Sequence, residues 1–251
     1  MSVLQLIFSD KYVNRPAIAN NLLLLSMYRF AYPFAFLLNR FGLSPDQITT
    51  LSLLSAIAAF AALILDASTA WFCFFWGLTV LFDFCDGTVA RMSSRIATRA
   101  FRYDHMSDIF KISLVSVGVA MRFGDKPLWT LCSMFLFTYL YSEIVSHDLK
   151  RTLELSNIDL APKAPEFELK KRHRIRDRVP VIRLIANRLP FFYTFLLQCF
   201  VAISTFNGHT LLVFFALPYG GVITYATLLY LTILSLLSCG KGICQLWRMR
   251  R

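Results

Sequence analysis

Four aspartates lie within a short stretch of this 251-residue chain, at spacings that suit helices. Asp83 and Asp86 are three residues apart, and Asp104 and Asp108 are four apart. Residues three or four apart share one face of a helix, so each pair would present its carboxylates together. Because the connection between the two pairs is short, we predict that their helices are antiparallel neighbours and that the four carboxylates converge.

A cluster of four carboxylates points to a bound cation. Like charges repel and are tolerated together only when a positive charge lies among them. Carboxylate oxygens are hard ligands that select Mg²⁺, Mn²⁺ or Ca²⁺ over softer metals. The structural alternative is that the aspartates cap helices or pair with nearby arginines, namely Arg91, Arg95, Arg99 and Arg102. Asp108 is hardest to explain in that way, because it would lie well inside a helix.

The residues beside the first aspartate pair suit a phosphate group. Gly87 and Ala90 have small side chains that would let a phosphate approach the backbone, although small residues also serve ordinary helix packing. Arg91 follows them and offers a planar fork for phosphate oxygens. A phosphate-bearing substrate beside a metal is therefore the chemistry that this stretch predicts.

The composition places these residues in a membrane protein. Hydrophobic residues make up 57% of the chain and charged residues only 16%, whereas soluble domains carry about a quarter charged residues. The six cysteines are scattered without a CxxC pair, so neither a disulfide framework nor a zinc site is predicted. No removable signal peptide is predicted either, since residues 1–20 lack a basic start followed by an apolar run.

Six windows are apolar and long enough for membrane-spanning helices, which need roughly 20 residues. They are Ile48–Leu65, Ala70 to about Arg91, about Ala100 to Met121, Leu128–Val145, Leu189–Phe206 and Leu211–Leu237. The first follows Ser44-Pro45-Asp46-Gln47, a capping-box spacing with proline at the first helical position. The predicted fold class is all-α, a polytopic bundle of six transmembrane helices.

The basic residues orient this bundle. Short polar breaks at residues 66–68, 124–127 and 207–209 mark one side of the membrane, and only Arg122 and Lys126 of the 26 basic residues lie on that side. The positive-inside rule then places both termini, the long loop and the aspartates at the cytoplasmic side. Since this rule accounts for most of the net charge of +11, nucleic acid is not predicted as a partner, whereas membrane lipids are.

Residues 21–43 are either a seventh span or a helix that lies on the membrane. Arg29, Pro33 and Arg40 interrupt them. An arginine near the centre of a span costs about 2.5–3.5 kcal/mol, so an interfacial helix is favoured. The predicted regions are residues 1–43 with the interfacial helix, 44–149 with four spans and the aspartates, 150–188 as a basic cytoplasmic loop, and 189–251 with two spans and a basic tail.

Three further side chains near the aspartates each have two interpretations. Lys111, three residues after Asp108, either binds a phosphate of the acceptor or balances the charge of Asp108. His105 is either a metal ligand or second base, or an ordinary histidine at a helix end. Glu143 either faces the cavity or forms a hydrogen bond between helices.

The stretch from Asp83 to Asp108 resembles the signature of the CDP-alcohol phosphotransferase family. The matching pattern is Asp83-x2-Asp86-Gly87-x2-Ala90-Arg91-x8-Ala100-x3-Asp104-x3-Asp108. Every fixed position agrees except one, because the family has glycine where this chain has Ala100. The added methyl group puts efficiency and acceptor identity in doubt more than the class of reaction.

The resemblance implies an enzyme of phospholipid synthesis that displaces CMP from a CDP-linked alcohol, most often CDP-diacylglycerol, by attack of a second alcohol. It implies two Mg²⁺ or Mn²⁺ ions among the four aspartates, with Asp108 as the general base. It places Gly87, Ala90 and Arg91 against the cytidine diphosphate, and it implies a homodimer. The location would be the inner membrane if the chain is bacterial.

Other functions remain open from the sequence. The donor could be CDP-choline or CDP-ethanolamine with diacylglycerol as acceptor, and the acceptor of CDP-diacylglycerol could be glycerol 3-phosphate, serine or inositol phosphate. Intramembrane carboxylates also occur in cation or proton transporters. A catalytically weakened family member that acts as a scaffold is the third possibility, and Ala100 is its only sequence indication.

Overall fold

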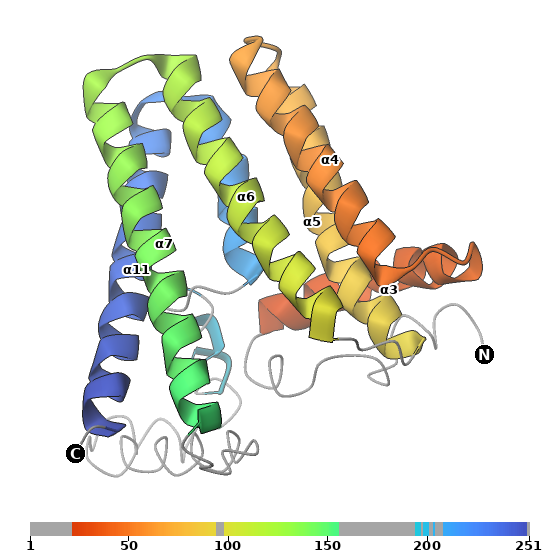
Figure 1. Cartoon of the computed structure of the whole chain (residues 1–251). Coiled ribbons are helices and arrows are strands. Elements are labelled where there is room, and N and C mark those ends of the chain that lie inside the picture. Colours follow the sequence, from red (N-terminus) through yellow and green to blue (C-terminus); the bar gives the residue numbers. More distant parts are fainter. Residues whose placement is uncertain are drawn as a thin grey trace.

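The computed structural model describes residues 22–93, 98–155, 194–196, 198–200, 203 and 208–249, and the regular elements in these ranges are helices. They are α3 (Leu22–Arg40), α4 (Pro45–Ile64), α5 (Thr69–Met92), α6 (Thr98–Phe123), α7 (Lys126–Leu155), the 3-10 helix η1 (Gly208–Tyr219) and α11 (Gly221–Met249). Helices α4, α5, α6, α7 and α11 run along roughly one common direction, and α3 lies crosswise to them on the side of α4 and α5 (Figure 1). The all-α prediction is confirmed for the described residues, while most of the predicted window Leu189–Phe206 lies outside them.

Helix α4 begins where its sequence predicts. The Ser44 hydroxyl accepts a hydrogen bond from the Gln47 amide, and the Gln47 side chain accepts one from the Ser44 amide at 2.8 Å. This reciprocal capping satisfies two amides that would otherwise lack partners at the helix start. The helix ends at Ile64, and Asp66 then adopts a φ of 50°, which turns the chain toward α5.

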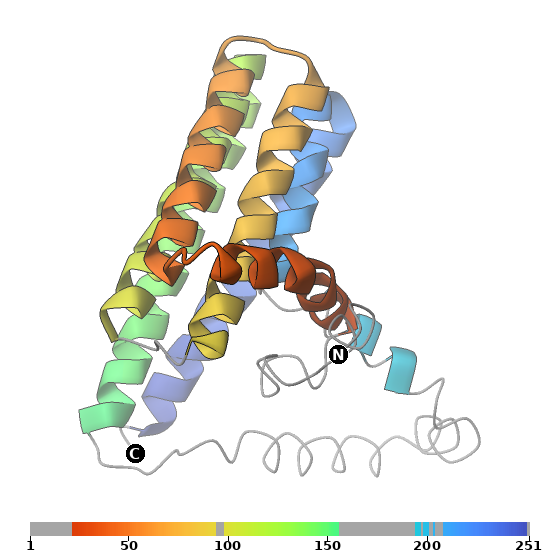
Figure 2. The ribbon, with the colours of Figure 1, turned by 90° about the vertical axis from the view of Figure 1, so that its right-hand side faces the viewer.

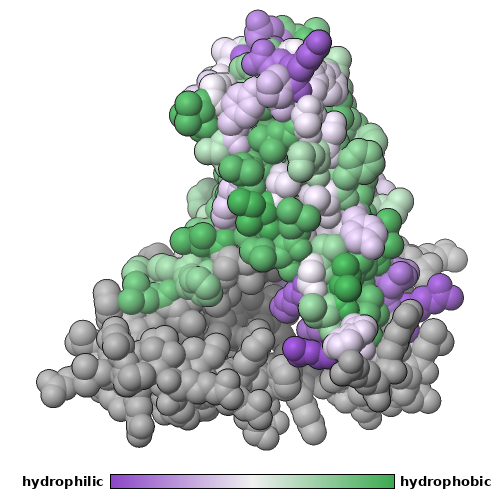
Figure 3. Space-filling model, turned by 90° about the vertical axis from the view of Figure 1, so that its left-hand side faces the viewer, coloured by the Kyte–Doolittle hydropathy of each residue, from purple (hydrophilic) through white to green (hydrophobic). Residues whose placement is uncertain are grey.

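Four of the described helices are long and apolar enough to cross a membrane, namely Pro45–Ile64, Thr69–Met92, Lys126–Leu149 and Gly221–Arg248. The surface formed by the α7 and α11 side of the bundle carries a broad apolar zone, with hydrophilic residues at its upper end and near its lower end (Figure 3). This is the pattern of an integral, multi-pass membrane protein. Helix α6 is equally long but is not among the four.

The prediction that Leu211–Leu237 forms one helix is wrong. Gly220 and Gly221 have φ values of 76° and 53°, and they separate η1 from α11. A left-handed backbone is open to glycine at little cost, so this pair permits a sharp turn that an apolar window does not reveal. A Cβ added at Gly220 would lie 2.8 Å from the Phe123 ring, so the turn packs beside the end of α6. The third turn on that side of the bundle is therefore formed by Gly220 and Gly221. The predicted polar break at 207–209 is instead where η1 begins.

The 3-10 helix η1 is attached to the centre of the bundle by aromatic packing. The Trp76 indole nitrogen donates a hydrogen bond of 2.7 Å to the Leu211 carbonyl. Its ring stacks on Phe214 with the ring centroids 5.2 Å apart, and both side chains are fully buried. An indole N–H buried in an apolar region needs such a partner, which fixes α5 against η1.

Helices α5 and α6 run in opposite directions, as predicted, but they are not packed neighbours within the described residues. Both pack on α4 instead. The Ser52 hydroxyl of α4 donates to the Thr79 carbonyl of α5 at 2.9 Å. Phe60 and Leu63 of α4 lie against Gly118 of α6. The carboxylates of α5 and α6 therefore meet across the end of α4 and not along a direct helix contact.

The close contact at Gly118 leads to a prediction about stability. A Cβ at this position would lie 2.9 Å from the Phe60 ring and 3.0 Å from the Leu63 side chain. We expect Gly118→Ala to lower the thermal unfolding midpoint in detergent, since overpacking costs about 1–3 kcal/mol. Gly240→Ala is the matched control, because nothing lies within 4 Å of its added Cβ, and it should leave the midpoint unchanged or raise it. Equal midpoints for the two variants would contradict the tight α4–α6 contact.

Helix α3 lies across the lower ends of α4 and α5 (Figure 2). Its inner face is held on α5, where the Tyr28 and Phe84 rings meet edge to face with centroids 5.0 Å apart. The Cys85 thiol of α5 also donates a hydrogen bond to the Ala31 carbonyl. Its outer face exposes large apolar side chains, including Leu23, Phe30, Phe34, Phe36 and Leu37. This crosswise orientation is that expected of a helix lying along a membrane surface.

Candidate metal and catalytic site

Helices α5 and α6 bring three of the four aspartates together. One carboxylate oxygen from each of Asp83, Asp104 and Asp108 lies within 4.8 Å of the others. Asp83 comes from the second half of α5, and the other two come from the first half of α6. The predicted convergence is therefore present for these three residues, and their spacing is one that a single ion could bridge.

Asp86 lies deeper than the other three. Its side chain is 4% exposed, and it accepts a hydrogen bond of 2.8 Å from the Thr49 hydroxyl of α4. Asp86 and Asp104 are close enough for their charges to interact. Asp86 thus joins the cluster from the side of α4, with an orientation that Thr49 helps to fix.

Lys111 supplies the positive charge closest to these carboxylates. Its Nζ lies 2.6 Å from Asp83 Oδ1 and 2.6 Å from Asp108 Oδ1, and it donates a hydrogen bond of 3.2 Å to the Ser52 hydroxyl. The residue is only 1% exposed. Of the two interpretations from the sequence, the structure favours charge balance, and it extends the balance from Asp108 to Asp83.

Arg91 lies over Gly87 at the end of α5. A Cβ added at Gly87 would be 3.3 Å from Arg91 Nη1, so the glycine leaves room for the guanidinium group. Arg91 Nη2 donates to the Thr88 hydroxyl at 3.3 Å, and the guanidinium carbon lies 5.3 Å from the centroid of the Tyr28 ring. Burial raises the pKa of the Tyr28 phenol, so this ring stays neutral. Ala90, in the same turn, is half-buried.

Tyr28 is a site residue that the sequence did not indicate. It lies 55 positions before Asp83 in a helix of apolar composition, and only the crossing of α3 over α5 brings it to Arg91. A guanidinium held over an aromatic ring has fewer orientations open to it. Tyr28 therefore helps to fix where the Arg91 fork points.

His105 and Glu143 form a second polar contact, between α6 and α7. His105 Nε2 lies 3.4 Å from Glu143 Oε2, with the side chains 39% and 23% exposed. Of the two interpretations of Glu143, an interhelical contact is what the structure shows. His105 is directed toward α7 and does not belong to the cluster of Asp83, Asp104 and Asp108.

Two hydroxyl residues of α4 were also missed. Thr49 contacts Asp86 and Ser52 contacts Lys111, and both side chains are buried, at 3% and 0% exposure. They are three residues apart and so share one face of α4. Polar residues on one face of an apolar span are the signal that could have found them, since a buried polar group in a membrane needs a partner.

Thr49 leads to a testable prediction about the orientation of Asp86. Thr49→Val keeps the size of the side chain and removes the hydroxyl. Removing an outer hydrogen bond to a metal-binding carboxylate typically costs 10–100-fold in metal affinity or activity. We therefore expect about 10–100-fold weaker Mn²⁺ binding, measured by electron paramagnetic resonance, and recovery in Thr49→Ser.

Thr232→Val is the matched control for this experiment. Thr232 is equally buried, at 3% exposure, and its hydroxyl donates only to its own helix, at Leu228 O. Its replacement should leave Mn²⁺ binding unchanged. An equal loss in both variants would mean that any buried hydroxyl matters, and the role of Thr49 would be contradicted.

The donor set fits a hard divalent cation. Asp83, Asp104 and Asp108 could offer carboxylate oxygens to one ion, and Mg²⁺ and Mn²⁺ prefer such oxygen ligands. The buried Oδ1 of Asp108 lies 2.6 Å from the Lys111 ammonium, which balances part of the charge of the cluster.

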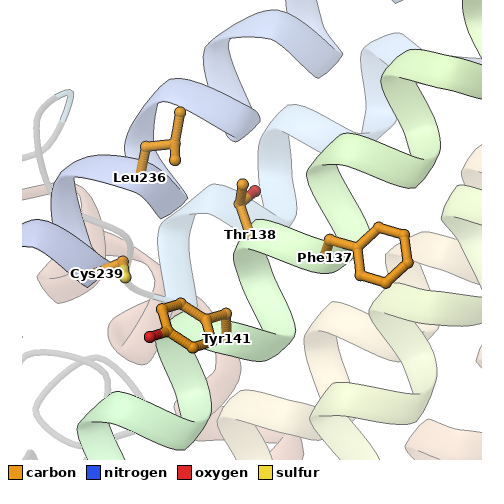
Figure 4. A pocket seen from close by; sticks show the side chains of 5 residues that line it. All are labelled: Phe137, Thr138, Tyr141, Leu236 and Cys239. Atoms are coloured by element: carbon orange, nitrogen blue, oxygen red, sulfur yellow. The ribbon is translucent and has the colours of Figure 1, made fainter.

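A surface pocket lies elsewhere, between α7 and α11. The side chains that line it are Phe137, Thr138, Tyr141, Leu236 and Cys239 (Figure 4). None of them is charged, and none belongs to the aspartate motif. The pocket therefore lacks the groups needed for metal or phosphate chemistry, and its lining suits contact with lipid chains.

The fold and the site together define a class of protein: a multi-pass helical membrane protein with an acidic, metal-suited cluster between two helices at one end of the bundle. Residues 42–159 match the family model described as CDP-alcohol phosphatidyltransferase. The matched segment contains the whole aspartate motif, and over these residues, just under half of the chain, the protein is similar to the enzymes of that family. A comparison with curated proteins found no match.

Proposed function

We propose that this enzyme transfers a substituted phosphate group from CDP-diacylglycerol to the hydroxyl of a second alcohol and releases CMP. The observation that carries the proposal is the meeting of Asp83, Asp104 and Asp108 within 4.8 Å in the segment that matches the family. The donor, the acceptor and the roles of individual residues below are parts of this proposal.

Asp108 is the proposed general base. A carboxylate within reach of the attacking hydroxyl removes its proton as the new bond to phosphorus forms. The bond between that phosphorus and the CMP oxygen breaks in the same displacement, and CMP leaves with the bonding electrons. Oδ1 of Asp108 is ion-paired with Lys111 at 2.6 Å, so the other carboxylate oxygen, Oδ2, is the one proposed to take the proton.

Asp83, Asp86, Asp104 and Asp108 are the residues proposed to hold two Mg²⁺ or Mn²⁺ ions. Bound divalent ions would neutralise the diphosphate and stabilise the charge on the departing CMP. Thr49 orients one of these carboxylates through its 2.8 Å hydrogen bond to Asp86.

Arg91 is proposed to bind the diphosphate oxygens. Its guanidinium carries a planar set of donors that matches phosphate. The Arg91 guanidinium contacts the Tyr28 ring, and the missing side chain of Gly87 leaves room for it beside the aspartates. Ala90 is half-buried, and its small side chain leaves room for the cytidine diphosphate to approach the same surface of α5.

We propose six membrane crossings with the aspartates at the cytoplasmic side. Besides the four apolar spans, α6 would form a fifth crossing and a segment that ends in η1 would form a sixth, so that residues of Leu211–Leu237 contribute to two crossings and not to one. Support comes from the exposed apolar side chains of α3, which suit the cytoplasmic interface, and from the scarcity of basic residues at the opposite turns.

The test is CMP release by the detergent-purified enzyme. The assay contains CDP-diacylglycerol with Mg²⁺ or Mn²⁺, and each acceptor is added separately: glycerol 3-phosphate, serine and inositol phosphate. Acceptor-dependent CMP release that a chelator abolishes would support the proposal and identify the acceptor. Release only from CDP-choline or CDP-ethanolamine with diacylglycerol would replace the donor. No release from any donor, in folded protein, would overturn it.

The proposed assembly is a homodimer, and it rests on the family resemblance. Light scattering coupled to size-exclusion chromatography would measure the protein mass in the detergent complex. A mass of one chain, 28.8 kDa, under conditions in which the enzyme is active would contradict the dimer.

A further inference from the structure

We propose that the Lys111 ammonium is a built-in cation of the metal site, so that the resting enzyme binds one divalent ion tightly and gains the second only with the nucleotide donor. This inference rests on the proposed function and adds an order of binding to it. It is drawn from the position of Lys111, which the motif of the family does not include.

The geometry of Lys111 is that of a bound cation. Its Nζ is 2.6 Å from one carboxylate oxygen of Asp83 and 2.6 Å from one of Asp108. Those two aspartates come from different helices and both belong to the cluster whose oxygens lie within 4.8 Å. The ammonium therefore bridges two of the carboxylates that a second divalent ion would need.

The position is also built to keep Lys111 in place. The residue is 1% exposed, so its aliphatic stem is packed and not free to swing into solvent. Ser52 of α4 accepts a further hydrogen bond from Nζ at 3.2 Å, and Ser52 itself donates to the Thr79 carbonyl of α5. A surface lysine that happened to meet an aspartate would have no such support from a third helix.

Charge balance then gives the order of binding. The four carboxylates carry a formal charge of minus four, which Lys111 reduces to minus three. One divalent ion leaves a small negative charge, whereas two would leave a positive excess in a poorly solvated site. Unbalanced charge is costly away from water, so the second ion would be bound weakly until an anionic diphosphate arrives with it.

The test counts Mn²⁺ ions by electron paramagnetic resonance in the full-length purified enzyme. Wild type should bind one ion tightly, and a second only after CDP-diacylglycerol is added without acceptor. Lys111→Met keeps the length of the side chain and removes its charge, so it should bind the second ion at least about tenfold more tightly without nucleotide. Lys126→Met, an exposed lysine at the far end of the bundle, is the matched control and should behave as wild type.

Each outcome decides the question. Two tight ions in nucleotide-free wild type, or a Lys111→Met variant that binds Mn²⁺ as wild type does, would overturn the inference while leaving the proposed function intact. No Mn²⁺ binding by either protein would overturn both. If Lys111→Met does not fold, Ser52→Ala is the deciding variant, because it removes a hydrogen bond to Nζ without changing any charge. A few-fold tighter binding of the second ion by this variant would support the inference. Unchanged or weaker binding would overturn it.

Discussion

Replacing Asp108 by asparagine is expected to lower the rate of CMP release by about 10²–10⁴-fold, the usual contribution of a general base. The amide has the size of the carboxylate but cannot take a proton from the acceptor. Lys111 would keep its partner Asp83, 2.6 Å away, so the local arrangement should persist. The measurement is kcat for CMP release at saturating Mn²⁺ and donor, because these conditions isolate the proton-transfer role.

The same variant separates a base from a metal ligand. If Asp108 acts mainly as the base, Asp108→Asn should bind Mn²⁺ within about tenfold of wild type while kcat collapses. A parallel fall in Mn²⁺ affinity that excess metal reverses would make it chiefly a ligand. The control is Asp125→Asn, an exposed aspartate at the opposite turn, which should retain full activity. An active Asp108→Asn enzyme would contradict the assignment.

The local parts of the fold follow from the sequence because their causes are local. The capping box at Ser44 and the apolar length of α4 predict both the start and the type of that helix. The helical faces of the aspartate pairs follow in the same way from spacings of three and four. The break at Gly220 and Gly221 was missed because an apolar window reports burial, while a left-handed turn depends on backbone freedom.

The parts of the site that depend on packing between distant segments were not predictable in the same way. Tyr28 reaches Arg91 only because α3 crosses α5, and Thr49 reaches Asp86 only because α4 lies between α5 and α6. The spacing of Lys111 from Asp108 gave their pairing as one of two interpretations. It did not predict the second contact with Asp83, which comes from another helix.

These contacts give α4 a role that its apolar sequence conceals. It separates α5 from α6 and presents Thr49 and Ser52 to the two sides of the acidic cluster. The aspartates are thereby held from two helices that do not pack on each other, around a third that fixes their distance. A site built in this way can keep four carboxylates close, because the packing of α5 and α6 on α4 opposes their mutual repulsion until cations balance the charge.

Replacing Asp83 by asparagine is expected to have the other large effect, a loss of CMP release of at least about 10³-fold at low Mn²⁺. Asp83 is the one residue of the three-carboxylate cluster that α5 contributes, and it also holds Lys111 at 2.6 Å. An amide oxygen is a weaker ligand for a hard cation and carries no charge to offset it.

The measurement is the Mn²⁺ dependence of CMP release, together with Mn²⁺ binding in the absence of donor. Asp83→Asn should need far more Mn²⁺ and should regain part of its rate when the ion is in excess, unlike Asp108→Asn. Asp66→Asn is the matched control, since that aspartate is 84% exposed in its ion pair with Arg122, and surface pairs contribute only about 0–1 kcal/mol. Wild-type Mn²⁺ dependence in Asp83→Asn would mean that the ions are held by α6 alone. In that case the meeting of α5 and α6 would serve the folding of the bundle and not its chemistry.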